Sequence, residues 1–85
     1  MTDPWADPRV IEGLDRQFER RSRALATGAS HVGWKVGFGA PSSLETMQIT
    51  APLLGYLTST TVLEPDVPVD VSGWQRGIVE FEVAV

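Results

Sequence analysis

The sequence contains no cysteine, one lysine (Lys35) and one histidine (His31) in 85 residues. Without cysteine, the chain has no disulfide scaffold, no zinc–thiolate site and no thiol nucleophile. No stretch approaches the roughly 20 apolar residues that a membrane-spanning helix needs. The first residues also lack the basic and apolar regions of a secretion signal. We therefore expect a cytoplasmic protein with no membrane partner.

Positive charge is scarce as well. Seven Lys and Arg residues face eleven Asp and Glu residues, for a net charge of −4. This balance disfavours a nucleic-acid partner, whose phosphates require clustered cations. One local exception is a group of four arginines, which are Arg16, Arg20, Arg21 and Arg23. Because acidic residues alternate with them, we predict a solvated helix face, with a subunit contact or an anion site as the alternative.

The first part of the chain has the pattern of an amphipathic helix. Asp7 and Pro8 form a typical helix start, with Asp as N-cap and Pro at the first helical position. An apolar stripe follows at helical spacing, and Gly28 is a good C-terminal stop. The sequence therefore predicts a helix over residues 8–27, with the stripe formed by Ile11, Leu14, Phe18 and Leu25.

The rest of the chain, residues 31–85, favours short strands. Bulky apolar residues alternate with glycine and Lys35 over residues 32–38, which predicts a strand. Ser42 and Glu45 have the spacing of a capping box, which predicts a short helix that ends at residues 50–52. Extended pieces are expected at 55–58 and 60–63, at most an edge strand at 67–71, and a strong strand at 78–85. The fold class is α+β, in a single domain.

Two glutamates lie on the last predicted strand. In the sequence Ile-Val-Glu-Phe-Glu-Val-Ala-Val, alternation places Glu80 and Glu82 on one face and Phe81 on the other. Their Cα atoms would be roughly 6.5–7 Å apart, so that both carboxylates could reach one Mg²⁺ or Mn²⁺ ion. The alternative is an ordinary strand with a solvated acidic face. Apolar residues on the same face, Ile78 and Ala84, favour the metal site.

Lys35 and His31 are the remaining candidates for chemistry. Lys35 lies between Gly33 and Gly37, which leave open space around its ammonium group. It could hold a carboxylate or enolate oxygen, or act as an acid–base group if its pKa were lowered; it could also be a plain surface lysine. For His31, a solvent-facing or hydrogen-bonded ring is the better interpretation.

The order of these features resembles a known family. The segment Gly33-Trp34-Lys35-Val36-Gly37-Phe38, a Ser-Leu-x-x-Met helix, a Pro-x-x-Gly-Tyr-Leu segment and the Glu80-x-Glu82 strand follow one another. This arrangement is similar to the N-terminal part of the 2-keto-4-pentenoate hydratase group of the fumarylacetoacetate hydrolase superfamily. The resemblance covers most of the chain, from about Arg20 to Val85, and it implies a β-rich fold of which this chain forms the start.

The resemblance implies an enzyme and its site. Glu80 and Glu82 would be two ligands of Mg²⁺ or Mn²⁺, and Lys35 would lie in the substrate pocket as a catalytic residue. The implied reaction adds water to a 2-hydroxydienoate in aromatic-compound catabolism, with the complete form expected to be a homo-oligomer. Relatives decarboxylate 2-oxo acids or hydrolyse a carbon–carbon bond. Thr50-Ala51 stands where the family commonly has an acidic residue.

The family takes its third ligand, an aspartate, from a strand beyond the position of Val85. We therefore expect a truncated domain that is inactive by itself, because two carboxylates hold Mg²⁺ weakly. The other hypothesis is a non-catalytic remnant that only associates with a homologue through its apolar last strand.

Overall fold

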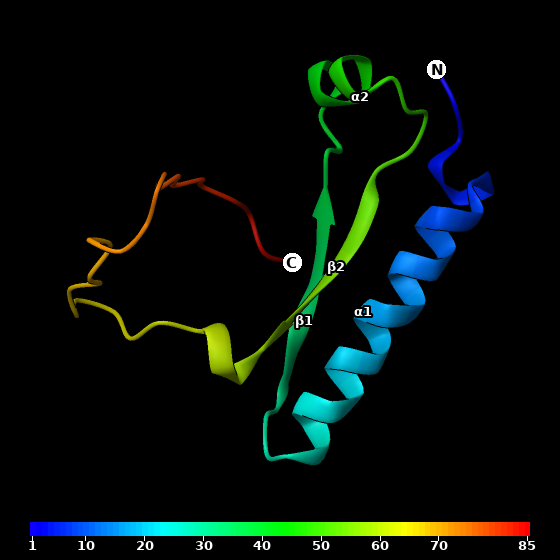
Figure 1. Ribbon diagram of the computed structural model, residues 1–85. Coiled ribbons are helices and arrows are strands. Elements are labelled where there is room, and N and C mark those ends of the chain that lie inside the picture. Colours follow the sequence, from blue (N-terminus) through cyan, green and yellow to red (C-terminus); the bar gives the residue numbers. More distant parts are fainter.

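The computed structural model describes all residues, 1–85, and shows a small α+β chain with one long helix and two antiparallel strands (Figure 1). Its elements in order are the 3₁₀ helix η1 (Pro4–Ala6), the helix α1 (Pro8–Ala26), the strand β1 (His31–Gly37), the short helix α2 (Pro41–Met47), the strand β2 (Leu53–Thr58) and the 3₁₀ helix η2 (Ser59–Thr61). Neither α-helix is long and apolar enough to cross a membrane.

The helix α1 begins and ends where its local sequence predicts. The Asp7 carboxylate accepts a hydrogen bond from the backbone N–H of Arg9 at 2.9 Å, and Pro8 occupies the first helical position. After the C-cap residue Thr27, Gly28 adopts a φ of 110°, a conformation that suits glycine. The predicted helix over residues 8–27 is therefore confirmed to within one residue.

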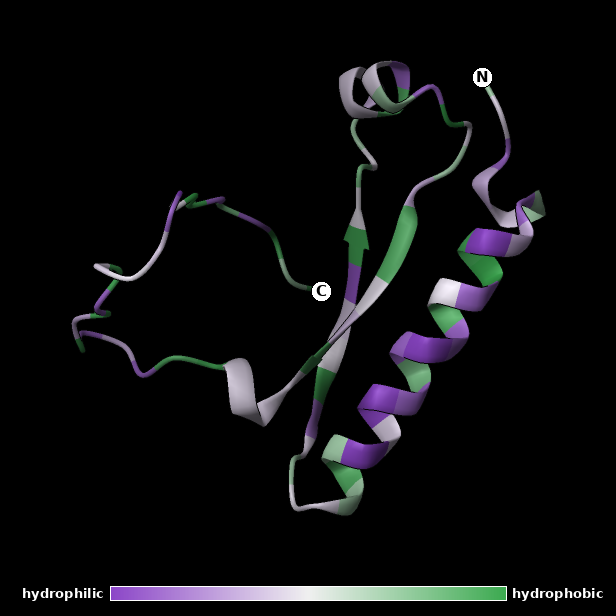
Figure 2. Cartoon of the chain, in the orientation of Figure 1, coloured by the Kyte–Doolittle hydropathy of each residue, from purple (hydrophilic) through white to green (hydrophobic).

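One face of α1 packs against the sheet. Leu14, Phe18 and Leu25 of the predicted stripe are half-buried, whereas Ile11 is exposed and Val10 is half-buried in its place. Hydrophobic bands alternate with hydrophilic ones along the helix in Figure 2. At its N-terminal end, the Trp5 indole N–H donates to the Pro52 carbonyl at 3.1 Å. These contacts fix α1 alongside β2 (Figure 1).

β1 and β2 pair in antiparallel fashion, with Trp34 opposite Tyr56 and Lys35 opposite Gly55. The predicted strand over 32–38 is confirmed with a shift of one residue, and the extended piece at 55–58 is part of β2. Residues 60–63 do not form a strand, because the chain turns into η2 after Thr58. The edge strand considered at 67–71 is absent as well.

The short helix α2 is confirmed, but its predicted capping box is wrong. Ala40 is the N-cap, no side chain caps the helix, and Pro41 at the first position starts it instead. The helix ends at Met47, before the predicted stop, because Gln48 adopts a left-handed φ of 56°.

The predicted strand at 78–85 is wrong, and so is the packing of Phe81 on its opposite face. These residues have no regular secondary structure, and Phe81 is 99% exposed. Alternation specifies a strand only where a neighbouring strand supplies hydrogen bonds and an apolar layer supplies contacts. No partner strand is present for these residues, since the sheet consists of β1 and β2.

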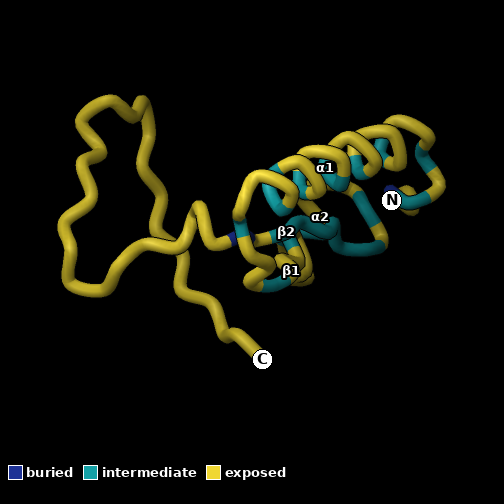
Figure 3. Tube along the Cα trace, turned by 90° about the horizontal axis from the view of Figure 1, so that it is seen from below, coloured by how far each residue is buried: buried dark blue, intermediate teal, exposed yellow.

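The molecule as a whole is more open than a globular chain of its size. Its accessible surface is 7296 Å², against roughly 5,000 Å² expected for a compact protein of this mass. Its radius of gyration is 15.3 Å, against roughly 12 Å expected. Only Pro4 and Thr58 are buried, and the segment 62–85 is exposed throughout (Figure 3). The helix and the sheet therefore form a two-layer unit that has no fully buried apolar side chain.

Candidate functional site

Lys35 lies in the middle of β1, in an open stretch of the sheet. A side-chain carbon added at Gly33 would meet no atom within 4 Å, and one added at Gly55 would lie 3.8 Å from Cβ of Lys35. Gly55 is the register partner of Lys35, so the strand opposite also presents no side chain to it. The glycines therefore leave room for the lysine side chain.

The Lys35 ammonium group donates a hydrogen bond to Oε1 of Glu82 at 3.0 Å. The two residues are 47 positions apart in the sequence and belong to different segments. The side chains are 44% and 54% exposed, which keeps the pair in contact with water. The hydrogen bond from Lys35 and then the negative charge of Glu82 raise the pKa of Lys35, with a smaller contribution from the charge of Glu80.

This raised pKa distinguishes between the two roles that the sequence left open. A lysine that acts as a base needs a lowered pKa, so that it is neutral near pH 7. Lys35 instead stays protonated beside Glu82 and has the properties of a positive hydrogen-bond donor. Such a donor can hold a carboxylate or an enolate oxygen.

A groove lies between β1 and the last residues of the chain. It measures about 610 Å³ and is lined by residues 32–36, Gly39, Ala40, Leu57 and residues 82–85. Most of its lining is apolar, and the Lys35–Glu82 pair supplies the charged groups. A mostly apolar groove with a few polar groups is the usual form of a small-molecule site.

Glu80 and Glu82 fit a hard divalent cation by the chemistry of their oxygens. Glu82 already holds one cation, the Lys35 ammonium, at 3.0 Å, and Glu80 is close enough for its charge to act on the same group. No group of three or more His, Cys, Asp or Glu side chains in the chain could hold a metal ion.

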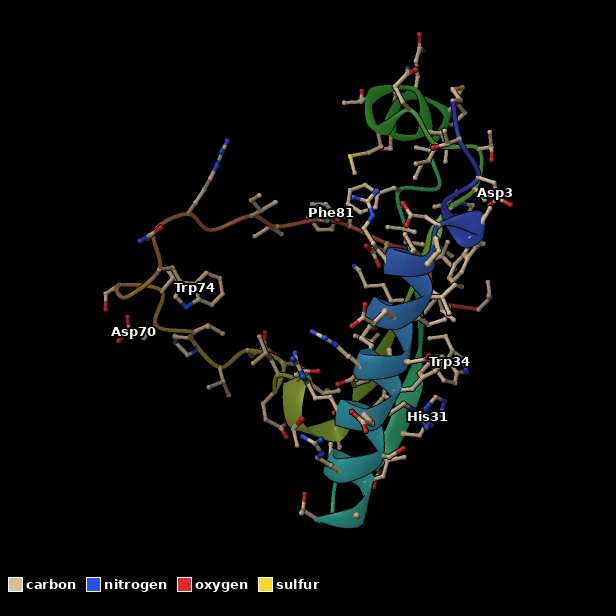
Figure 4. The ribbon with its side chains drawn as sticks, turned by 45° about the vertical axis from the view of Figure 1, so that its right-hand side comes forward. Asp3, His31, Trp34, Asp70, Trp74 and Phe81 are labelled. Carbon is tan, nitrogen blue, oxygen red and sulfur yellow. The ribbon has the colours of Figure 1, made fainter.

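A second cluster, formed by Phe18, Arg21, His31 and Trp34, joins α1 to β1. The Arg21 guanidinium carbon lies 4.9 Å from the centre of the Trp34 ring, and the Phe18 ring meets that ring edge-on at 5.9 Å. Figure 4 shows the His31 and Trp34 rings beside one another, next to the helix. We name this group the aromatic cluster.

Within the aromatic cluster, Nη2 of Arg21 donates to Nδ1 of His31 at 3.2 Å. Since arginine can only donate, His31 accepts at this nitrogen. The prediction of a hydrogen-bonded histidine is confirmed.

The predicted solvated arginine face holds for Arg16 and Arg23, which pair with acidic neighbours on α1, but Arg21 turns onto the sheet. The spacing of Phe18 and Arg21, three residues apart on one helix face, was the available signal.

Comparison with known proteins identifies no relative of this chain. No family model matches the chain, no curated protein matches it, and no solved structure matches it.

Proposed function

We propose that this chain forms the N-terminal part of a cytoplasmic, divalent-metal-dependent enzyme of the 2-keto-4-pentenoate hydratase type. The observation that supports the proposal is the Lys35–Glu82 pair, in which two residues 47 positions apart meet at 3.0 Å beside a groove. In this proposal the helix and the two strands are the start of a β-rich fold of the fumarylacetoacetate hydrolase type, and the complete form is a homo-oligomer.

The proposed substrate is a small 2-hydroxydienoate or its 2-oxo form, taken from aromatic-compound catabolism. Glu80 and Glu82 would hold Mg²⁺ or Mn²⁺, which supplies Lewis acidity toward the oxygens of a 2-oxo acid. Lys35, as a protonated donor, would hold an oxygen of the substrate and stabilise the negative charge that develops there. The apolar lining of the groove would contact the hydrocarbon tail.

The decisive experiment measures the binding of 2-oxopentanoate, a non-reacting analogue, by ligand-observed NMR. We expect binding in the presence of millimolar Mg²⁺ and its loss without the cation, in E80Q and in E82Q. The control is Glu45→Gln, a glutamate on α2 outside the groove. Binding that does not depend on the cation, or that survives both substitutions, contradicts the proposal.

Turnover is the second part of this test. We expect the 85-residue chain with Mg²⁺ to hydrate 2-hydroxypentadienoate far more slowly than the ~1–10³ s⁻¹ of ordinary enzymes. The reason is that the pair is about half exposed, so that water weakens each charge interaction in the groove. The rate is measured from the loss of ultraviolet absorbance of the substrate. A rate in the ordinary range would show that two carboxylates suffice.

A second candidate function is association without catalysis. The apolar side chains of the segment 62–85 are exposed, with Val79 at 84% and Val83 at 91%, and they could contact another copy or a homologue. Binding of 2-oxopentanoate with Mg²⁺ distinguishes the two, since association alone requires neither.

A further inference from the structure

We infer that a cavity between α1 and β2 is a binding site for a small uncharged aromatic alcohol of the phenol class. The cavity measures about 260 Å³, and none of its lining residues belongs to the groove beside Lys35. The inference therefore goes beyond the proposed function, and the binding that it describes requires no cation.

The walls of this cavity come from three elements and are mostly apolar. α1 contributes residues three or four positions apart, which share one helix face, and η1 and β2 complete the lining. The apolar members are Trp5, Val10, Leu14, Leu53 and Leu54. All five are half-buried. No charged side chain lines the cavity, so an anionic ligand would have no counter-ion there.

Gly13 accounts for the open space on the helix side. It is the only glycine within a helix of this chain, where glycine is destabilising relative to alanine or leucine. A side-chain carbon added at Gly13 would meet no atom within 4 Å, so the packing of α1 on β2 does not require a glycine. Gly13 is exposed, whereas the other lining residues are half-buried. The glycine therefore lies at the entrance of the cavity and keeps it open.

Gln17 supplies the one polar side chain of the lining. Its amide makes no hydrogen bond within the chain. A side-chain carbon added at Gly55 of β2 would lie 3.8 Å from Oε1 of Gln17, so the missing side chain leaves room beside the amide. Because an amide both donates and accepts, it can pair with the hydroxyl group of a ligand.

Volume and lining together define the ligand class. Pockets for drug-sized ligands measure roughly 300–1,000 Å³, whereas an apolar cavity of about 150 Å³ already holds benzene. The 260 Å³ of this cavity therefore suits a single aromatic ring with a small substituent. The ring would contact the leucines and Trp5, whose indole N–H is fixed to the Pro52 carbonyl, and the hydroxyl group would pair with Gln17.

The experiment measures the binding of phenol to the 85-residue chain by NMR titration. We expect affinity in the millimolar range, because the lining is only half-buried. Gly13→Leu fills the entrance and should weaken binding about tenfold or more, the scale of burying one apolar ring. The matched control is Gly13→Ala, which also favours the helix but leaves most of the cavity open, and it should bind like the unmodified chain. Far-ultraviolet circular dichroism checks that both variants keep their helix.

The ligand class is tested with Gln17→Met, which keeps the length of the side chain but removes its amide. It should weaken phenol binding by about 2–10-fold, the scale of one hydrogen bond, and leave toluene binding unchanged. Benzoate, which has the same ring with a negative charge, should bind the unmodified chain more weakly than phenol. Benzoate binding as tight as that of phenol, or an unchanged preference for phenol over toluene in Gln17→Met, overturns the assignment to an aromatic alcohol.

The location of the bound ligand is tested with the indole N–H signals of the three tryptophans. Trp5→Phe and Trp74→Phe assign two of these signals. Phenol should shift the signal of Trp5, which lines the cavity, and leave that of Trp74, which lies in the irregular segment. Absence of phenol binding, equal binding by Gly13→Leu, or a shift of Trp74 without one of Trp5 overturns the inference.

Discussion

At the scale of single residues, Asp7 shows how one side chain performs two tasks. Its carboxylate caps α1 by accepting from the N–H of Arg9, and it also forms an ion pair with the Arg9 guanidinium at 2.8 Å. The side-chain hydrogen bond from Arg9 and then its backbone hydrogen bond lower the pKa of Asp7 from 3.8 to about 2. The ionised form is therefore the one that the folded chain favours.

The first prediction concerns the acid sensitivity of α1. Because the folded-state pKa of Asp7 lies below its usual value, the stabilisation is complete above about pH 4 and is lost as the pH falls through about 2. We expect the ellipticity at 222 nm to fall over this range by more in the unmodified chain than in Asp7→Asn, which keeps a capping side chain without a charge.

The control for this prediction is Asp70→Asn. The backbone N–H of Ser72 also lowers the pKa of Asp70, but this residue lies in a segment without helix. Its substitution should leave the acid-induced change in ellipticity as it is in the unmodified chain. Identical pH profiles for the unmodified chain and Asp7→Asn would show that the cap does not depend on ionisation.

At the scale of the elements, the aromatic cluster connects α1 to β1. Trp34 meets Phe18 edge-on and lies under the Arg21 guanidinium, although half of its surface is exposed. Aromatic pairs contribute about 0.5–1.5 kcal/mol beyond burial, and an exposed cation–π contact contributes about 0.5–1 kcal/mol. Trp34 therefore contributes to the contact of α1 with β1, in addition to the packing of α1 against β2.

The second prediction is that Trp34→Ala lowers the free energy of unfolding by about 2 kcal/mol, less than a fully buried tryptophan because the ring is half exposed. The measurement is urea denaturation followed by far-ultraviolet circular dichroism. Trp74→Ala is a matched control, since Trp74 is 56% exposed and lies in an irregular segment. It should change the stability by less than about 0.5 kcal/mol. Equal losses in the two variants would contradict the role of the aromatic cluster.

At the scale of the whole molecule, exposed apolar surface is the dominant feature. The accessible area of 7296 Å² exceeds the roughly 5,000 Å² of a compact chain of this mass. Much of the excess lies in the segment 62–85, in which every residue is exposed (Figure 3). Exposed apolar patches of this kind favour association with other protein surfaces.

The third prediction is that the isolated chain self-associates, and that Phe81→Asp with Val83→Asp reduces this association. Both side chains are more than nine-tenths exposed, so the substitutions remove apolar surface without disturbing the sheet. Sedimentation velocity at increasing protein concentration measures the effect. The control is Val67→Asp with Val69→Asp, which adds the same charge to the same segment. A monomer at all concentrations, or an equal effect of the two double variants, would contradict a specific role of residues 81 and 83.

The sequence by itself determined the elements whose signals are local. The Asp7-Pro8 start, the apolar stripe and Gly28 fix α1, because a helix forms hydrogen bonds between residues four positions apart. The alternation around Lys35 indicates β1, and the glycines beside it predict the open space that the structure shows. The strand predicted at 78–85 failed, because alternation indicates which residues share a face but supplies no partner strand.

Only the tertiary structure decided which distant residues meet. Glu82 alone, without Glu80, contacts Lys35, and Arg21 leaves the solvated arginine face to cover Trp34. The Lys35–Glu82 contact has no signal within a few positions of sequence. The spacing of Phe18 and Arg21 shows only that the two share a helix face, and the packing of α1 on β1 decides that this face meets Trp34. The upward shift of the Lys35 pKa follows from the first of these contacts, so it too depends on long-range geometry.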